Sequence, residues 1–200
     1  MSTLRIQGLC TLMGGPYDLI LEPGECVGIS GPSGAGKTLM LRAIADLDPH
    51  QGDVFLDGNA ASELPAPRWR RQVAMLPAES RWWYHRVGEH FSQVNHEWLE
   101  GLGFDEQMLS VPVSRLSTGE RQRLALVRMI SLAPRVLMLD EPTAGLDSRN
   151  TRRVEDLVAR YRDACQAPVL WISHNTRQLR RVAGRRFVLK NGALEQPGDP

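Results

Sequence analysis

Short apolar runs alternate with stretches of helical spacing along most of the chain. The runs that predict buried strands are 25–30, 73–77, 136–139 and 168–173. The stretches with apolar residues every three or four positions, typical of amphipathic helices, are 39–45, 117–130 and 151–161. Because strands that alternate with helices form sheets covered by those helices, the pattern predicts an α/β core with a mainly parallel sheet.

The two ends of the chain show a different, β-rich pattern. Apolar stretches at 4–9 and 17–21 are separated by Gly14-Gly15-Pro16, and residues 53–59 form a third apolar run. Residues 185–196 contain two short runs around Asn191-Gly192, a dipeptide typical of hairpin turns. We therefore expect β-structure before the first core strand and a hairpin near the end.

Residues 79–112 have apolar positions at irregular three- and four-residue intervals, which predicts helices inserted between strands. The positions are Val87, Phe91, Val94, Trp98 and Leu102. Three adjacent aromatics, Trp82-Trp83-Tyr84, precede them, and they cannot all point to one side. At least one should be exposed, as at a binding surface, although a local core of the inserted helices explains the cluster equally well.

Composition limits the possible functions. At 200 residues with 42% hydrophobic content, the chain is expected to form a single domain over 1–200, with a frayed tail at 196–200. No apolar run approaches the roughly eighteen residues needed to cross a bilayer, so any transmembrane path would belong to another chain. The net charge of +1 gives no general attraction to nucleic acid, and no nucleic-acid partner is expected.

One segment fills the pattern G-x-x-x-x-G-K-[ST] directly after the first core strand. It consists of Gly31, Pro32, Ser33, Gly34, Ala35, Gly36, Lys37 and Thr38. Glycines let the backbone turn its N–H groups inward, and a helix beginning near Gly36 directs its positive end at an anion. Lys37 would reach the β- and γ-phosphates and Thr38 would bind Mg²⁺. The segment predicts a nucleoside triphosphate site; the alternative is a tight strand–helix turn.

Polar residues follow two other predicted strands. Asp140 and Glu141 end the run 136–139, and His174 follows the run 168–173. Because an unpaired buried charge is costly, adjacent carboxylates at a strand end favour a metal or proton-transfer role over helix capping. Ligands of open α/β sheets bind at this edge, which gives His174 a place in the same site, although a lone histidine is often structural.

Five ordered motifs give the chain a family resemblance covering nearly all of residues 1–190. They are Gly31–Thr38, Leu116–Arg123, Val136–Pro142, Ala144–Asp147 and Ile172–His174. The sequence resembles the nucleotide-binding subunit of ATP-binding-cassette (ABC) transporters. That resemblance implies a P-loop fold of ABC type, with a mainly parallel core sheet, an N-terminal antiparallel β subdomain and an inserted helical subdomain at about 79–130.

The resemblance also implies residue roles. Asp140 would orient Mg²⁺, Glu141 would activate the attacking water, and His174 would contact the γ-phosphate of ATP. Ser117 and Gly119, at a predicted helix N-terminus, would cap the ATP held by a second subunit in a head-to-tail homodimer, with Asp147 across the same interface. Ser117 is also expected to act as an ordinary N-cap.

Several positions depart from the family pattern. Ala78 stands where a glutamine is usual, with Glu79 next. Leu39 stands where a Ser or Thr often contacts the α-phosphate. We still expect Leu39 in the ATP site, but without the hydroxyl that makes this contact. No aromatic residue clearly replaces the adenine-stacking tyrosine; Leu12 or Met13 is nearest, and Tyr17 comes late.

The implied function is ATP hydrolysis that powers a separate transmembrane subunit, which would hold the protein on the cytoplasmic face of the membrane. The segment 73–78 is also similar to subunits of bacterial metal exporters, but the sequence identifies neither cargo nor direction. One alternative is a soluble ABC ATPase acting on DNA or ribosomes, but such proteins usually carry a coiled-coil insertion or a second cassette. The other is a small P-loop kinase, which has no reason to carry the motifs at 116–123 and 144–147.

Overall fold

The computed structural model describes residues 1–196, so the predicted tail 196–200 lies outside the described residues except for Gln196. The strands are β1 (Leu4–Thr11), β2 (Gly14–Leu21), β3 (Cys26–Ser30), β4 (Gln51–Leu56), β5 (Asn59–Ala60), β6 (Val73–Leu76), β7 (Val136–Asp140), β8 (Val169–Ile172), β9 (Arg185–Lys190) and β10 (Ala193–Glu195). The α-helices are α1 (Lys37–Ile44), α2 (Ala66–Gln72), α3 (His96–Gly101), α4 (Thr118–Ile130), α5 (Ser148–Cys165) and α6 (Thr176–Val182).

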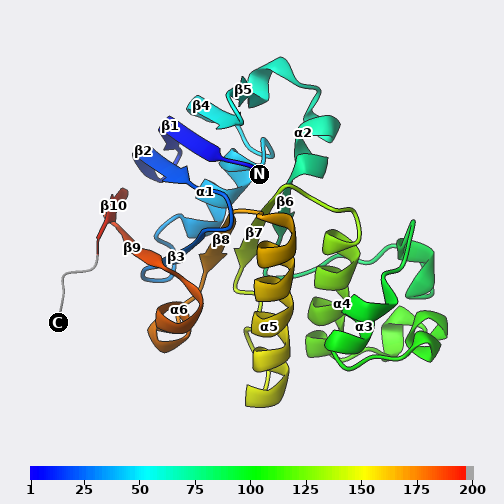
Figure 1. Cartoon of the computed structure of the whole chain (residues 1–200). Coiled ribbons are helices and arrows are strands. Elements are labelled where there is room, and N and C mark those ends of the chain that lie inside the picture. The colour runs from blue at the N-terminus through cyan, green and yellow to red at the C-terminus, as the bar shows by residue number, and fades with distance from the viewer. Residues whose placement is uncertain (197–200) are drawn as a thin grey trace.

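The strands form two sheets (Figure 1). The first is antiparallel, with four strands in the order β2-β1-β4-β5. The second has six strands in the order β10-β9-β3-β8-β7-β6, all parallel except the terminal β9–β10 hairpin. The mainly parallel core sheet and the N-terminal antiparallel part are therefore confirmed.

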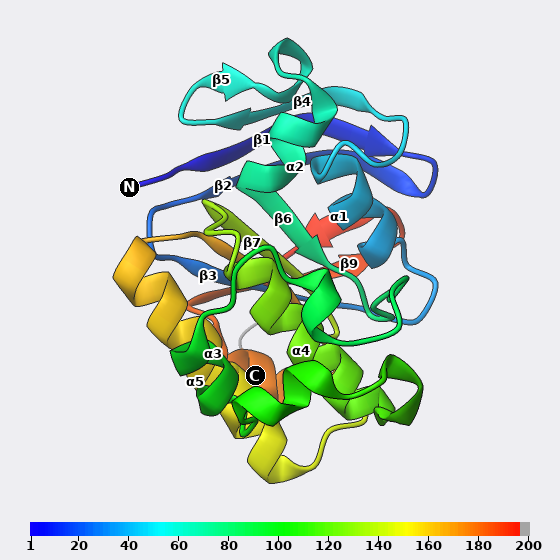
Figure 2. The same ribbon diagram turned by 90° about the vertical axis from the view of Figure 1, so that its right-hand side faces the viewer.

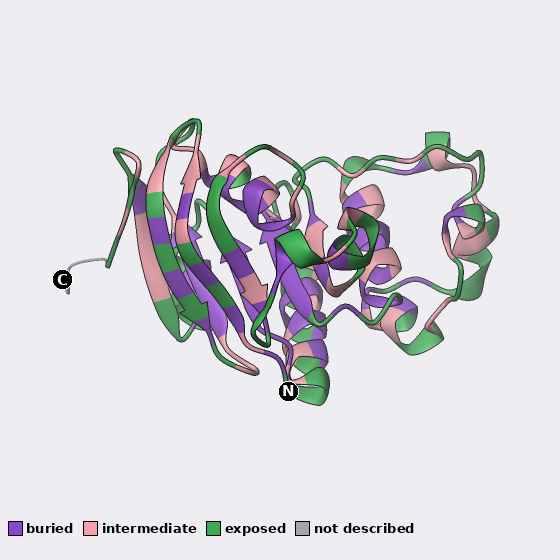
Figure 3. Cartoon of the chain, turned by 90° about the horizontal axis from the view of Figure 1, so that it is seen from above, coloured by how far each residue is buried: buried purple, intermediate pink, exposed green. Residues whose placement is uncertain are grey.

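Side chains that alternate between the two faces of the central strands divide the interior into two apolar cores. In β7, Val136 and Met138 pack with α1 and the antiparallel sheet, whereas Leu137 and Leu139 face α4 and α5. Side chains of successive strand residues point to opposite faces, so a strand that is apolar throughout must be covered on both. In Figure 3, buried residues gather on the central strands and on the helix faces beside them.

The inserted segment is helical, as predicted, but its helices before α4 are short. Between β6 and α4 the structure has one six-residue α-helix, α3, and three 3₁₀ turns, the rest being loop (Figure 2). The apolar positions that suggested helices are nonetheless buried or partly buried against α4 and α5. Asn95 and Asp105 cap short helical turns through their side chains, which explains why the helices begin afresh instead of continuing.

Candidate nucleotide-binding site

The phosphate loop connects β3 to α1, and its geometry leaves backbone donors free. Gly36 is the N-cap of α1 with φ of 93°, a left-handed conformation that favours glycine, and no side chain caps the helix. The first N–H groups of a helix lack partners within it. The start of α1 is thus suited to bind an anion.

Position 31 requires glycine because the backbone of another strand lies too close for a Cβ atom. Its φ is 148°, and a Cβ placed on it would lie 2.3 Å from the carbonyl oxygen of Leu189 in β9. The Ser30 hydroxyl also donates to the Phe187 carbonyl, 3.3 Å away. The loop therefore begins pressed against the C-terminal hairpin.

Lys37 closes the loop. Its ammonium donates to the carbonyl oxygens of Gly31, at 3.0 Å, and Pro32, at 2.9 Å. Burial lowers the pKa of Lys37, with Glu141 and Asp140 acting in the opposite direction. These neutral acceptors hold the ammonium at the loop, where phosphate oxygens would make stronger, charge-assisted bonds.

Thr38 and Asp140 meet directly. The Thr38 hydroxyl donates to Oδ2 of Asp140 over 2.7 Å, linking the start of α1 to the end of β7. Hydroxyl and carboxylate oxygens are ligands that Mg²⁺ accepts, and Mg²⁺ needs few protein ligands because it keeps water and substrate phosphates. Within residues 1–196, no group of three or more His, Cys, Asp and Glu residues forms a metal cluster. The Thr38–Asp140 pair fits a metal bound together with a triphosphate.

Glu141 has a strained backbone and one carboxylate oxygen without a hydrogen bond. Its φ is 47°, unusual for a residue with a side chain, and its N–H donates to the Ile172 carbonyl of β8 at 3.1 Å. Its Oε1 is buried without a hydrogen-bond partner and lies 3.6 Å from Nε2 of His174. Burial raises the pKa of the Glu141 carboxyl, while His174 and Lys37 lower it, with a net upward shift. A partly buried carboxylate with one unbonded oxygen is suited to accept a proton.

These groups line one pocket of about 300 Å³. Its walls contain Met13, Ser33, Gly34, Ala35, Gly36, Lys37, Thr38, Leu39, Ala78, Asp140, Glu141 and His174. Gly31 and Pro32 do not line it and instead hold Lys37. The structure thus gathers the three predicted motifs in one place, with Leu39 and Ala78 at its wall.

The remaining predicted residues lie elsewhere on the chain. Ser117 caps α4 in a reciprocal capping box: its Oγ accepts from the Glu120 N–H at 3.2 Å, and its own N–H donates to Glu120 at 2.8 Å. Asp147 caps α5 by accepting from the Asn150 N–H at 2.8 Å. A Cβ on Gly119 would lie 2.8 Å from Leu146, so these two segments are neighbours. The predicted N-cap role of Ser117 is confirmed.

The structure decides between the candidates at the base end of the pocket. Tyr17 is 1% exposed and packs in the core, so it cannot stack on a nucleotide. Leu12 is 94% exposed and does not line the pocket, whereas Met13 does. Sequence position alone could not separate Leu12 from Met13, since they are adjacent in the β1–β2 turn.

Comparison with known proteins now decides the family. The family model described as "ABC transporter" matches residues 15–144, which include the loop, α4 and the Asp140–Glu141 pair. The chain belongs to the ABC transporter family. Specifically, its fold and motifs are those of the ABC nucleotide-binding domain, as the resemblance predicted, and the extent of the match disfavours the kinase alternative.

Two relatives and one solved structure illustrate the match. Protein STAR1 of Oryza sativa subsp. japonica is 35% identical over 88% of this chain and 55% of its own length. The tungstate uptake system ATP-binding protein TupC of Peptoclostridium acidaminophilum is 32% identical over 88% of this chain and 86% of its own. A bacterial Atm1-family ABC exporter with ATP bound has the same fold, with a TM-score of 0.84 and 20% identity over 97% of this chain and 38% of that chain.

The ABC domain described here spans about half the length of several curated relatives that it matches. Among residues 1–196, no helix is both long and apolar enough to cross a membrane.

Proposed function

We propose that this ABC domain binds and hydrolyses ATP to power a separate transmembrane subunit. The observation that carries the proposal is the single pocket in which the phosphate loop faces Asp140, Glu141 and His174. Phosphoryl transfer depends mainly on positioning and charge neutralisation, and this pocket provides both.

Each side chain then has a chemical task. Lys37 and the N–H groups at the start of α1 hold the β- and γ-phosphates. Thr38 and Asp140 would hold Mg²⁺, which would neutralise phosphate charge. Glu141 takes the proton from the attacking water, a task for which its unpaired Oε1 is placed. His174, next to Glu141, contacts the γ-phosphate side of the pocket.

We propose a head-to-tail homodimer as the working form. Ser117, Gly119 and Asp147 do not line the pocket of their own chain, and Ser117 and Asp147 are exposed. Since the N-terminus of α4 favours an anion, this surface suits the phosphates of ATP held by a second copy. Two Mg-ATP molecules would then lie between the subunits.

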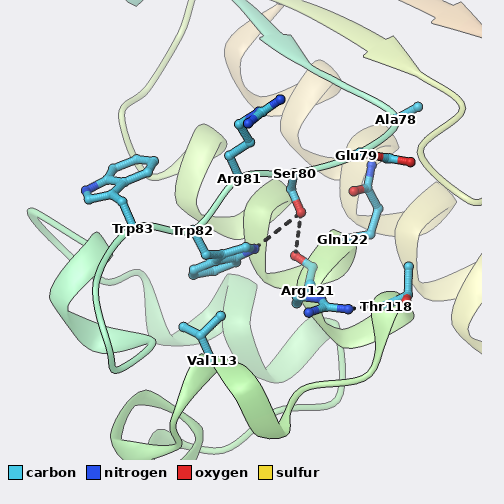
Figure 4. Close-up of a pocket in the computed structure, with 10 residues that line it drawn as sticks. All are labelled: Ala78, Glu79, Ser80, Arg81, Trp82, Trp83, Val113, Thr118, Arg121 and Gln122. Carbon is cyan, nitrogen blue, oxygen red and sulfur yellow. Dashed lines mark hydrogen bonds between the residues drawn. The ribbon is translucent and has the colours of Figure 1, made fainter.

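A docking surface for the transmembrane subunit is proposed around the aromatic segment 82–84. Trp83 is 64% and Tyr84 54% exposed, which confirms that the three aromatics do not all point inward. In Figure 4, the Trp82 indole N–H donates to the Ser80 hydroxyl, and both Trp82 and Trp83 line a cavity of about 680 Å³. Relatives such as TupC are named as ATP-binding parts of uptake systems, which supports a membrane partner and a location at the membrane's cytoplasmic face.

The substitution Glu141→Gln tests the catalytic assignment. The amide cannot accept the proton of the water, so Mg-dependent ATP hydrolysis should fall by about a hundredfold or more, within the usual range for losing a general base. ATP binding should persist, and the variant should accumulate as an ATP-bound dimer on size-exclusion chromatography. Turnover at the wild-type rate would remove Glu141 from its assigned role. Hydrolysis without a dimer would leave the ATPase assignment intact and refute the dimer.

A further inference from the structure

The side chains of Glu141 and His174, neighbours in the nucleotide pocket, are not joined by a hydrogen bond. Oε1 of Glu141 and Nε2 of His174 are 3.6 Å apart, which is too long for one. The His174 side chain is 55% exposed, and the backbone of Glu141 has a conformation that persists only where its surroundings enforce it. The relative position of the two side chains must therefore come from the segments that carry them.

Gln178 of α6 binds both chain neighbours of His174. Its side-chain oxygen accepts from the Ser173 hydroxyl at 2.9 Å, and its backbone N–H donates to the Asn175 side chain at 3.1 Å. The Ser173 hydroxyl in turn accepts from the Asn175 N–H at 3.1 Å. These three hydrogen bonds fix the turn between β8 and α6, and this turn carries the histidine.

The same side-chain amide also binds the loop that follows Glu141. The hydroxyl of Thr143, two residues after Glu141, donates to Oε1 of Gln178 at 3.1 Å and accepts from its Nε2 at 2.9 Å. The Ala144 N–H donates to the Glu141 carbonyl at 3.1 Å and closes a turn over these residues. Because the turn is short, a displacement of Thr143 displaces Glu141 as well.

A buried charge fixes the orientation of the Gln178 amide. Gln178 is 1% exposed, and its Nε2 also donates to Oε1 of Glu155 at 2.9 Å. Turning the amide over would place its oxygen against that carboxylate, which only accepts hydrogen bonds. Burial by itself raises the pKa of Glu155, but hydrogen bonds from Arg181, at 2.8 and 2.5 Å, and from Gln178 hold it below its usual value. The carboxylate therefore stays ionised near neutral pH and keeps the amide turned toward the two loops.

We infer that Gln178 is a positioning residue for the proposed reaction: its buried amide holds the turn around His174 against the loop that follows Glu141, so that the γ-phosphate contact and the water-activating carboxylate keep one relative position. The inference rests on the proposed function for the roles of these two side chains and adds the residue that aligns them. Gln178 does not line the pocket, so it acts only through its neighbours. A misplacement of about 1 Å can lower a rate by about a hundredfold, so this alignment bears directly on turnover.

The first experiment separates positioning from nucleotide binding. Gln178→Leu keeps a side chain of similar size without hydrogen-bonding groups, so kcat for ATP hydrolysis should fall by about tenfold or more. The ATP dissociation constant measured by calorimetry should stay near that of wild type, because the phosphate loop lies between β3 and α1. A wild-type kcat in folded Gln178→Leu overturns the inference.

Tyr161→Phe is the matched control for a lost buried hydrogen bond. The Tyr161 hydroxyl of α5 donates to the Pro134 carbonyl at 2.6 Å, before the start of β7 and so at the opposite end of that strand from Asp140. This variant should melt below wild type but keep its kcat. An equal loss of kcat in Tyr161→Phe and Gln178→Leu would show a general effect of destabilisation and overturn the inference.

Two further sets of variants decide the question even if Gln178→Leu fails to fold. Gln178→Glu alone sets a second carboxylate against Glu155 and should lower kcat. Adding Glu155→Gln exchanges the amide and the carboxylate, restores a donor opposite an acceptor, and should recover most of the lost turnover. Thr143→Val, at a half-buried position, removes only the hydroxyl that binds the amide and should lower kcat, whereas Thr143→Ser keeps the hydroxyl and the rate. Equal turnover in the two Thr143 variants, or no recovery by the exchange, overturns the inference.

A spectroscopic measurement that needs no hydrolysis separates this inference from the proposed function. In protein with isotope-labelled histidine, the NMR signal of the His174 ring is assigned by its absence in His174→Ala. It should shift in Gln178→Leu and Gln178→Glu and stay in place in Tyr161→Phe. If the wild-type protein hydrolyses no ATP, the proposed function fails, while the His174 signal still reports whether Gln178 holds the turn. An unchanged His174 signal in both Gln178 variants overturns the inference whatever the ATPase activity.

Discussion

The ammonium of Lys37 donates to the carbonyl oxygen of Gly31, six residues earlier, at 3.0 Å. The bond closes the loop around its own cation before any phosphate is bound. Because the same ammonium is partly desolvated, a phosphate can replace the neutral carbonyls without drawing the lysine out of water. The loop is therefore organised in advance, and little side-chain entropy should be lost on binding.

Removing that cation should weaken nucleotide binding. Lys37→Ala deletes a hydrogen bond to a charged group, commonly about 1.5–3 kcal/mol, so ATP affinity should fall about ten- to a hundredfold by calorimetry. Lys190→Ala, an exposed lysine on β9, is the control and should bind ATP as wild type does. Unchanged affinity in Lys37→Ala would count decisively against the phosphate-loop assignment.

The pocket should discriminate poorly between ATP and GTP, with affinities within about tenfold. Met13 is the only candidate base platform among the three considered, and its thioether offers neither a ring to stack on nor a strong hydrogen-bonding group. Met13→Tyr should tighten both nucleotides by about 1–3 kcal/mol through stacking, which is tolerant of base identity. Leu12→Tyr, outside the pocket, should change neither. A strong preference for ATP in wild type would mean that another group reads the base.

Glu141→Gln should stabilise the nucleotide-free protein near neutral pH. A carboxyl whose folded pKa is raised destabilises the fold when ionised, so its cost is present above the folded pKa and disappears as pH falls toward the ordinary value of 4.5. The melting temperature of the variant should exceed that of wild type at neutral pH, and the difference should shrink as the solution is acidified. Each 1 kcal/mol corresponds to about 2–4 °C for a chain of this size.

Glu120→Gln should change the stability of the fold in the opposite direction. Hydrogen bonds from the Ser117 side chain and backbone lower the pKa of Glu120. Its stabilising effect is therefore present above the unfolded pKa and is lost as pH falls, so this variant should melt below wild type at neutral pH and converge with it in acid. If both variants shift in the same direction, burial does not control Glu141.

Substitutions in the aromatic segment should separate one half-buried residue that supports the fold from two exposed residues that do not. Trp82 is half-buried and packs against the apolar core around α4, and Trp82→Ala should cost about 3 kcal/mol of folding stability. Trp83→Ala and Tyr84→Ala should melt as wild type does, and at least one should lose the membrane partner by about thirty-fold, equivalent to about 2 kcal/mol, while ATPase activity persists. Three strongly destabilised variants would leave no support for a docking surface.

The core of the site could be predicted because its chemistry is local in sequence. Residues 31–38 follow one strand, and Asp140 and Glu141 end another, so parallel pairing brings them to one sheet edge. The Thr38–Asp140 bond could not be predicted, since it depends on how α1 packs across β7, which the sequence pattern does not specify.

The hydrophobic pattern was less informative where it selected the buried side chains correctly but not the secondary structure that carries them. From residue 87 to 102 the apolar spacing correctly selected side chains that pack against α4, but side-chain caps divide the backbone into short turns. Helix α6 was not predicted because only Leu179 and the half-buried Val182 give it an apolar side, while its other buried residue, Gln178, binds Glu155. Hydrogen bonds of this kind leave no periodic signal.

The contact between Gly31 and Leu189 has a consequence for the order in which the protein matures. The backbone of β9 forms the support against which the loop begins, and the turn after β9 also bonds to Gly15 of β2. These contacts join segments far apart in the chain, and loop closure over such separations is slow. We therefore expect the phosphate loop to gain this support only after residues 185–195 have left the ribosome, so that nucleotide capture comes late in synthesis and depends on a hairpin that does not line the pocket.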